Sequence, residues 1–296
     1  MTDATRECSV VLPDGRRMGY AEYGDPSGPG VFYFHGLPGS RHEPAVFGAD
    51  AARGLGVRLV ALERPGYGLS SPHPGRRLRD FPADVAAVAD ALGVERFSVL
   101  GYSGGGVSAL ACAWALPERV RGAAFVNGLG PLDGSAETGL EVLPVWHPQR
   151  LLLGTAARSS WLLRLCASWI ISSGRRDLEF FFSRMTPADQ RVAQRAEVRE
   201  WLRGGMLGES QRQGIDATVQ DLQLALLPWG FPVEDIRVPV CLFAGTEDPH
   251  CPPAMARALS RHIPGASLTV LEGAGHFAVF DHFERMLRAL LEAAGT

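Results

Sequence analysis

Residues 98–106 read SVLGYSGGG and contain the most informative segment of the chain, Gly101-Tyr102-Ser103-Gly104-Gly105. An apolar strand is predicted to end just before this segment, and a helix is predicted over Val107–Leu116. A serine in so short a connection is forced into a strained backbone, while flanking glycines let neighbouring segments approach closely. Its Oγ is then exposed beside a helix N-terminus, whose free N–H groups favour developing negative charge. The segment predicts that Ser103 is a nucleophile; a glycine-rich turn that only closes a strand–helix unit is the alternative.

Short apolar runs alternate with helical patterns on both sides of this segment. Near the start, a turn at Pro13-Asp14-Gly15 separates two predicted strands, Glu7–Leu12 and Arg17–Tyr23. Short apolar runs separated by helices are typical of a parallel sheet that is buried on both faces. The sequence therefore predicts an α/β fold, with a mostly parallel central sheet flanked by helices. The further predicted strands are Val31–Phe34, Val57–Leu62, Phe97–Leu100, Gly122–Val126, Val240–Ala244 and Ser267–Leu271, and the further predicted helices are Asp80–Leu92, Ala254–Arg261 and His282–Ala293.

The alternation stops between about Gly130 and Phe231, where no convincing strand is found. Five of the six tryptophans lie in this stretch. One helix start is clear, with Thr186 as N-cap, Pro187 at the first helical position and Asp189 in the first turn. We expect residues 131–231 to form an all-helical cap inserted into a core made of residues 1–130 and 232–296. Along the helix that starts at Thr186, four arginines recur at every fourth residue and predict a solvated face, with an anion-binding stripe as the alternative: Arg191, Arg195, Arg199 and Arg203.

Composition narrows the class of protein. The 296 residues are 46% hydrophobic and 21% charged, which is typical of a globular chain with a large core and excludes a disordered or fibrous protein. A net charge of −3 argues against nucleic-acid binding. All 29 basic residues are Arg, which excludes a lysine nucleophile, and five cysteines without a CxxC spacing are typical of reduced thiols. Because no signal-peptide pattern and no apolar run of ~20 residues is present, we expect a cytoplasmic protein without a membrane partner.

Candidates for a base and an acid follow two strands near the C-terminus. A serine hydroxyl is a weak nucleophile unless a base accepts its proton and an acid orients that base. His276 follows the last predicted strand, and Asp248 follows the strand before it. Because open parallel sheets carry their sites at the carboxyl ends of the strands, we expect Ser103, Asp248 and His276 to meet. Glu247 and Asp133 are alternatives for the acid, and a loop histidine that caps a helix is the alternative for His276.

An acyl-transfer site also needs donors for a developing oxyanion. The N–H of Gly104, directly after the nucleophile, is one candidate. The segment HGLPGS, which starts at His35, follows a central strand and can supply the second donor, for which we select the N–H of Leu37. Removing one such donor typically costs about 2.7–4 kcal/mol of transition-state stabilisation.

Together these motifs resemble the α/β-hydrolase fold family, in its capped small-molecule branch of esterase-like serine hydrolases. The resemblance covers residues 1–130 and 232–296, and it implies the chain order Ser, Asp, His for a catalytic triad. It favours Asp248 through GTEDPHCP, which is similar to the family's GxxDxxxP, and it implies no metal and no organic cofactor. The family loop that matches Glu63 usually begins with Asp, so Glu63 is a conservative departure. The motifs that carry the resemblance are HGLPGS at His35, ERPGYGLS at Glu63, GYSGG at Gly101, and GTED and GAGH near the end.

The resemblance also narrows the reaction. HGLP is similar to a loop of epoxide hydrolases and haloalkane dehalogenases, but those enzymes attack with an aspartate where this chain has Ser103. Perhydrolases usually have Met in place of Gly104, and the GGSWG of proline iminopeptidases does not match Tyr102 and Gly104. We therefore expect hydrolysis of a small, largely apolar carboxylic ester through an acyl-enzyme. Alternatives are thioester, lactone or carbon–carbon cleavage or a tailoring step in a biosynthetic pathway, and the rival from another class is a receptor-like protein that binds a ligand without turnover.

Aromatic and histidine side chains near these motifs are candidates for a pocket that holds a small-molecule substrate. The aromatic residues Trp146, Trp161, Trp169 and Phe180–Phe182 could line such a pocket or only seal the cap onto the core. For His42 the alternative is a surface histidine at a helix start. His250 and Cys251 adjoin the candidate acid and are expected to be loop structure. The oligomeric state stays open. The residues selected for the pocket are His35, Tyr102, His42, Trp146, Trp161 and Phe277.

Overall fold

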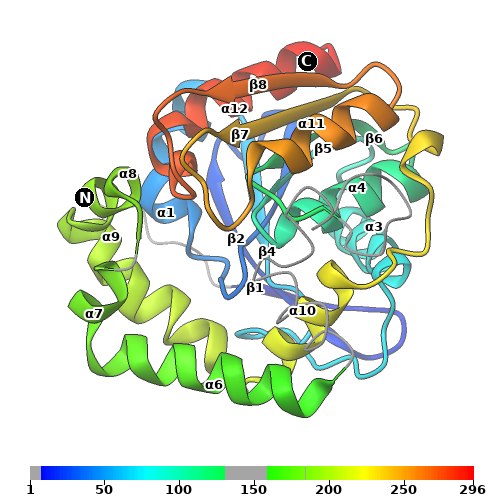
Figure 1. Cartoon of the computed structure of the whole chain (residues 1–296). Helices are drawn as coiled ribbons and strands as arrows, with labels where there is room; N and C mark the ends of the chain where they lie inside the picture. Colours follow the sequence, from blue (N-terminus) through cyan, green and yellow to red (C-terminus); the bar gives the residue numbers. More distant parts are fainter. Residues whose placement is uncertain (1–7, 131–158, 184) are drawn as a thin grey trace.

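The computed structural model describes residues 8–130, 159–183 and 185–296, and Figure 1 shows their arrangement. Eight strands form one sheet in the order β1-β2-β4-β3-β5-β6-β7-β8. The pairs β1–β2 and β2–β4 are antiparallel, and all other neighbours are parallel. The predicted α/β fold with a mostly parallel sheet is therefore confirmed. The strands are β1 (Cys8–Val11), β2 (Arg17–Gly24), β3 (Gly30–Phe34), β4 (Arg58–Leu62), β5 (Phe97–Tyr102), β6 (Val120–Val126), β7 (Val240–Gly245) and β8 (Ser267–Leu271).

Helices cover both faces of this sheet. Along β3, Phe32 and Phe34 pack into a hydrophobic cluster with α3, α4 and α11, whereas Val31 and Tyr33 pack into a second cluster with α2 and α12. Successive side chains of a strand point to opposite faces, so an uninterrupted apolar strand requires cover on both sides. The covering helices are α1 (Pro44–Phe47), α2 (Ala49–Gly54), α3 (Phe81–Ala91), α4 (Gly105–Ala115), α11 (Pro253–His262) and α12 (Ala278–Ala294), with short 3₁₀ turns at Leu78–Asp80 and Val233–Asp235.

Between β6 and β7 the described residues, 159–183 and 185–231, contain helices and no strand. We call these residues the helical insertion. In Figure 1 its helices, coloured green to yellow, lie together on one side of the sheet. No helix in the described parts of the chain is long and apolar enough to cross a membrane. The insertion contains α6 (Ser160–Arg176), α7 (Leu178–Phe182), α8 (Pro187–Ala193), α9 (Ala196–Trp201), a π-helical turn (Leu202–Met206), a 3₁₀ turn (Glu209–Gln211) and α10 (Asp216–Leu226).

The structure confirms the helix start that was predicted at Thr186. It does not contain one long helix that carries all four arginines, because two short helices, α8 and α9, take its place. The Thr186 side chain accepts a hydrogen bond from the N–H of Asp189, and Pro187 opens α8. The chain then turns, and Arg195 takes an extended backbone before α9 begins. The regular spacing of arginines therefore does not describe one helix face, because spacing alone cannot reveal a turn between two short helices. Arg195 and Arg199 are each paired with a carboxylate, those of Asp281 and Glu179 respectively.

Candidate active site

Ser103 occupies the turn between the end of β5 and the start of α4. Its φ of +53° lies in the left-handed region that residues other than glycine rarely adopt. The turn is held by a 2.8 Å hydrogen bond from the N–H of Ser103 to the carbonyl of Val126. Close packing explains the first glycine of the motif, since a Cβ on Gly101 would lie 2.1 Å from the carbonyl oxygen of Gly105. The strained turn predicted for this serine is therefore present.

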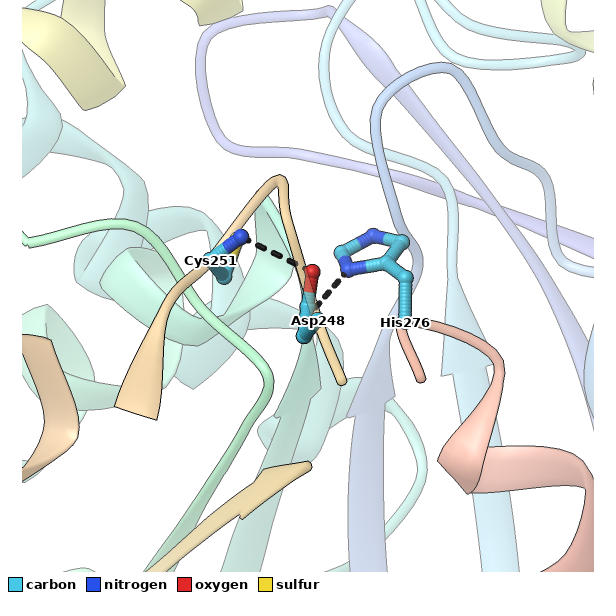
Figure 2. Close-up of side chains that lie close together, drawn as sticks. All are labelled: Asp248, Cys251 and His276. Atoms are coloured by element: carbon cyan, nitrogen blue, oxygen red, sulfur yellow. Dashed lines mark hydrogen bonds and ion pairs between the residues drawn. The ribbon is translucent and has the colours of Figure 1, made fainter. Parts of the chain in front are cut away.

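His276, in the loop between β8 and α12, connects Ser103 to Asp248. Its Nε2 lies 3.0 Å from Ser103 Oγ, and its Nδ1 lies 2.8 Å from Asp248 Oδ2. Because an ionised carboxylate only accepts, the proton is on Nδ1, which leaves Nε2 free to accept from the serine hydroxyl. Figure 2 shows the imidazole facing Asp248, which lies in the loop after β7. The structure thus brings together the three side chains selected from the sequence.

Asp248 is buried and receives four hydrogen bonds. Its Oδ2 accepts from His276 and from Asn127 Nδ2 at 2.8 Å, while its Oδ1 accepts from the backbone N–H groups of His250 at 2.8 Å and Cys251 at 2.9 Å. Burial opposes ionisation, but the charge and hydrogen bond of His276, followed by the N–H of Cys251, hold the pKa of Asp248 below its usual value. The carboxylate is therefore ionised and fixed in position.

Of the two alternative acids, Glu247 has an exposed side chain, and Asp133 lies outside the described residues. Sequence reasoning missed Asn127, which directly follows β6 and has a φ of +45°. Its Nδ2 donates to Asp248 and, at 2.9 Å, to the carbonyl of Gly275 beside the histidine. Asn127 thereby ties the acid loop to the histidine loop. Its place at the end of a parallel strand is the signal that could have identified it.

The imidazole of His276 is a stronger base than an ordinary histidine. Burial lowers its pKa, but the charge and hydrogen bond of Asp248, and then the charges of Asp189 and Glu43, raise the pKa above its ordinary value of 6.5. A raised pKa favours the imidazolium that forms when the ring accepts a proton. The arrangement therefore suits a general base that acts on Ser103.

Leu37 and Gly104, the two predicted oxyanion donors, are close neighbours. A Cβ added to Gly104 would lie 2.2 Å from Leu37 Cγ, so the leucine packs directly on the glycine. Among the described residues, no backbone acceptor pairs with the N–H of either residue. Backbone N–H groups without such an acceptor, close to the serine, can donate hydrogen bonds to a developing oxyanion.

Buried charges hold the backbone before Leu37. Arg64 donates to the carbonyl of His35 and, through Nη2 at 2.9 Å, to the carbonyl of Gly36. The Glu43 carboxylate accepts the N–H of Gly36 at 3.1 Å. In a trans peptide the C=O and N–H point in opposite directions, so fixing the Gly36 carbonyl also fixes the direction of the next N–H, that of Leu37. Neither Arg64 nor Glu43 was selected from the sequence, because nothing local distinguishes them from surface charges.

Two of the predicted pocket residues are corrected by the structure. His35 is fully buried, its Nδ1 donates to the Gly36 carbonyl at 2.9 Å, and its Nε2 accepts the N–H of Arg64 at 3.2 Å. Since both ring nitrogens bind backbone, the prediction that His35 faces a substrate is wrong. Trp161 is 68% exposed on α6, and Trp169 is 62% exposed, because the buried face of that helix is formed by other residues. The prediction that Trp161 lines a buried pocket is therefore also wrong.

The other predicted pocket residues lie in different surroundings. Tyr102 is buried, and its hydroxyl donates to the backbone carbonyl of His276 at 3.2 Å. Phe277 is buried against Trp201 and belongs to the hydrophobic cluster of the insertion. His42 is half-buried after the loop of Leu37. Trp146 lies outside the described residues.

Asp248, Cys251 and His276 also have donor atoms of the kinds that bind metals, all within 4.8 Å of one another (Figure 2). The backbone N–H of Cys251 donates to Asp248 Oδ1 at 2.9 Å. The carboxylate and the imidazole already bind each other through the atoms concerned. In this structure the cluster is therefore joined by hydrogen bonds, which belong to the relay of Ser103, His276 and Asp248.

A cavity of about 780 Å³ opens between the loop that follows β4 and helix α10. Its wall includes Arg76, which pairs with the buried carboxylate of Asp221. Asp221 also binds Nε of Arg64 at 2.6 Å. The cavity is thus connected through buried ion pairs to the arginine that holds the Gly36 carbonyl, although neither Ser103 nor His276 lines it.

The structure thus combines a mostly parallel sheet with a strained serine, a histidine and a buried carboxylate, which are joined by hydrogen bonds at the carboxyl ends of the strands. The chain belongs to the alpha/beta hydrolase fold family, whose model matches residues 29–283. It is 34% identical over 128 residues to epoxide hydrolase B of Mycobacterium tuberculosis, a match that covers 40% of this chain and about a third (34%) of that relative.

Two further comparisons span more of the chain. It is 27% identical over 248 residues to the 2-hydroxy-6-oxononadienedioate/2-hydroxy-6-oxononatrienedioate hydrolase of Burkholderia vietnamiensis, covering 82% of this chain and 78% of that protein. Among solved structures, it is similar to a hydrolase from Pseudomonas aeruginosa PA01, with a TM-score of 0.72, 19% identity, and coverage of 99% and 100% of the two chains. The structural likeness concerns the fold.

Proposed function

We propose that the protein hydrolyses a small, largely apolar carboxylic ester through an acyl-enzyme on Ser103. The observation that carries the proposal is the relay in which His276 lies 3.0 Å from the serine Oγ and 2.8 Å from Asp248. Each side chain has one role: Ser103 is the nucleophile, His276 the general base and acid, and Asp248 the group that holds the imidazole tautomer.

In the first half of the reaction, Ser103 Oγ attacks the ester carbonyl while His276 Nε2 accepts its proton. The carbonyl oxygen becomes an oxyanion, which accepts hydrogen bonds from the N–H groups of Leu37 and Gly104. The imidazolium then donates its proton to the leaving alcohol as the C–O bond breaks. The acyl group remains on Ser103.

In the second half, water attacks the acyl-enzyme and His276 accepts one of its protons. The tetrahedral species collapses, the carboxylic acid leaves, and the proton returns to Ser103. Asp248 stays ionised throughout, because its four hydrogen bonds favour the charged form.

We further propose that residues 131–231 act as a cap over this site. Three ion pairs between the helical insertion and the loops after β3 and β4 support this role: Arg41–Glu209, Arg64–Asp221 and Arg76–Asp221. Arg41 binds both Glu63 at 2.5 Å and Glu209 of the insertion at 2.9 Å, while Arg64 binds Asp221 of α10. A cap held this way can exclude water and select the acyl group.

The test is Ser103→Ala assayed on short p-nitrophenyl esters, with Ser108→Ala on α4 as the matched control. The serine variant should lose about 10³-fold or more in kcat, while the control should stay close to wild type. A fluorophosphonate probe should label wild-type protein at Ser103 and leave the variant unlabelled. Activity of Ser103→Ala within about tenfold of wild type would remove the proposal.

Carbon–carbon bond hydrolysis with the same residues is a second candidate. It is favoured by the similarity to the Burkholderia hydrolase, which extends over 82% of this chain. A panel containing p-nitrophenyl esters and a 2-hydroxy-6-oxo-dienoate separates the two reactions through kcat/KM. Epoxide opening is not assigned despite the similarity to epoxide hydrolase B, because residue 103 is a serine. Stoichiometric ligand binding without turnover on any member would instead favour the receptor-like alternative.

A further inference from the structure

Asp189, in the first turn of α8, reaches from the helical insertion to the loop that carries His276. Its side chain is almost fully buried, with 3% exposure. One carboxylate oxygen, Oδ2, accepts the backbone N–H of His276 at 3.0 Å, and Oδ1 accepts the N–H of Phe277 at 2.7 Å. Two consecutive amides of the histidine loop are therefore bound by one carboxylate that is 87 residues away in sequence.

This contact is not explained by helix capping. An acid at the third position of a helix commonly binds the backbone N–H of the N-cap residue. In α8 the Thr186 side chain accepts the N–H of Asp189, and its hydroxyl lies 3.1 Å from Asp189 Oδ2. The backbone N–H groups that the carboxylate accepts are those of the histidine loop and not that of the N-cap residue. The loop is shaped for this approach, since a Cβ on Gly275 would lie 2.3 Å from Asp189 Oδ1.

We propose that Asp189 is a positioning residue through which the helical insertion sets the orientation of the catalytic base. This inference rests on the proposed role of His276 as general base. By fixing the N–H groups on either side of the His276 Cα, the carboxylate limits how the imidazole can rotate away from Ser103. Loss of a reacting geometry by about 1 Å can cost 10²-fold in rate.

The charge of Asp189 also acts on the imidazole. It raises the pKa of His276, in addition to the larger effect of Asp248, and Glu43 acts in the same direction, all against the lowering effect of burial. Removing the Asp189 charge should therefore lower the imidazole pKa, even with Asp248 intact. The groups that face His276 are Asp248, His250 and Cys251 after β7, Ser103 and Tyr102 at the end of β5, Glu43 before α1, and Asp189 in α8.

The first test is Asp189→Asn, with Asp281→Asn as the matched control. Asp281 is half-exposed on α12, where it pairs with Arg195 and makes no bond to the histidine loop. We expect Asp189→Asn to lower kcat on a p-nitrophenyl ester about 10–100-fold, with KM changed by less than about threefold. Its His276 ¹⁵N resonances should titrate at lower pH than in wild type, whereas the control should match wild type in both measurements.

The titration does not require turnover, so it separates this inference from the proposed function. If the wild type hydrolyses no ester, the proposed function fails, and the histidine titration still decides the role of Asp189. An Asp189→Asn variant that keeps the kcat of the wild type and in which His276 titrates at the same pH as in the wild type would overturn the inference. A loss that appears only as lower thermal stability, with kcat and titration retained, would also overturn it.

Gly275→Ala tests the same contact without removing the charge and serves if Asp189→Asn does not fold. The added methyl should displace the carboxylate, so that kcat falls and the amides of His276 and Phe277 lose protection against hydrogen exchange. In an Asp189→Ala background the same substitution should cost much less, because the oxygen it collides with is absent. Retained protection with unchanged kcat in Gly275→Ala, or equal costs in both backgrounds, would contradict the inference.

Discussion

If the N–H groups of Leu37 and Gly104 bind the oxyanion as proposed, replacing Gly104 by Ala should disable that site without touching the side chains of the relay. The added Cβ would lie 2.2 Å from Leu37 Cγ and 2.3 Å from its Cδ1, where ordinary contacts begin at 3.4 Å. Leu37 must therefore move by about 1 Å in a packed environment. The Cβ of Leu37 would also be too close, at 2.9 Å from the added Cβ. Rotation of the leucine side chain therefore does not relieve the clash, and the backbone has to shift.

Backbone strain does not contribute to this effect. Gly104 has φ −60° and ψ −19°, which alanine adopts readily. The cost therefore comes from separating the Leu37 amide from the Gly104 amide. Losing one oxyanion donor typically removes about 2.7–4 kcal/mol, or 10²–10³-fold in kcat. KM should change little, because the oxyanion forms only after the substrate has bound.

The assay is steady-state hydrolysis of p-nitrophenyl butyrate, with thermal melting to confirm the fold. The double variant Leu37→Ala/Gly104→Ala removes the two atoms in closest contact and keeps only the 2.9 Å contact with the Cβ of residue 37. Because a smaller shift relieves that contact, the double variant should recover at least about tenfold of the lost kcat. Leu37→Ala alone is the control for any loss of substrate contact. A kcat for Gly104→Ala within about threefold of wild type, or a double variant no faster than the single one, would refute the paired-donor reasoning.

Asp248→Asn should lower kcat on the same ester about 10³–10⁴-fold, because the amide can present a donor to His276 and stabilise the wrong tautomer; a loss under about tenfold would exclude Asp248 as the orienting acid. The pH profile of kcat/KM should fall on its acidic side with a midpoint above 6.5, since the base must be neutral and the pKa of His276 is raised; a midpoint at or below 6.5 would contradict the assignment. Burial raises the pKa of Glu43 from 4.5 to about 7. The unfolded chain therefore loses this proton at a lower pH than the folded protein does, so the contribution of Glu43 to the free energy of unfolding is full below pH 4.5 and is lost as the pH rises through about 7. Glu43→Gln should remove this pH-dependent loss of stability, which is worth about 3 kcal/mol. Urea denaturation of both proteins at about pH 5 and pH 8 measures the loss. An equal change of unfolding free energy with pH in wild type and variant would rule out this role of Glu43.

Most of the fold can be predicted because its signals are local. The apolar run Val240–Ala244 differs from the observed strand β7 by one residue, since a strand buried on both faces leaves no polar position in its interior. The last helix, α12, begins at Ala278, whereas the sequence pattern predicts a start at His282. Its first turn is apolar, like the loop before it, so the amphipathic pattern becomes visible only further along the helix.

Within the candidate site, residues at strand ends could be predicted, and residues that act through buried contacts could not. Ser103, Asp248 and His276 each lie in the loop after a recognisable strand, within five residues of its end, and parallel strands bring such positions to one edge. Asp189 occupies a helix position that capping already explains, so its sequence context offers no reason to seek a distant partner. His35 also follows a strand, but a histidine that binds backbone has the same local sequence as one that faces a substrate.

The inward side of the helical insertion illustrates why aromatic residues alone do not locate a pocket. On α6, Trp161 and Trp169 share an exposed face, while Leu163 and Ala167 are buried on the other. Both faces carry apolar residues, so periodicity cannot assign the inner one. Polar contacts are more informative, because the buried carboxylate of Asp189 has to meet its donors. Since those donors belong to the histidine loop, a substitution that shifts α8 should change kcat as well as KM, whereas a substitution that only reshapes a pocket wall should act mainly on KM.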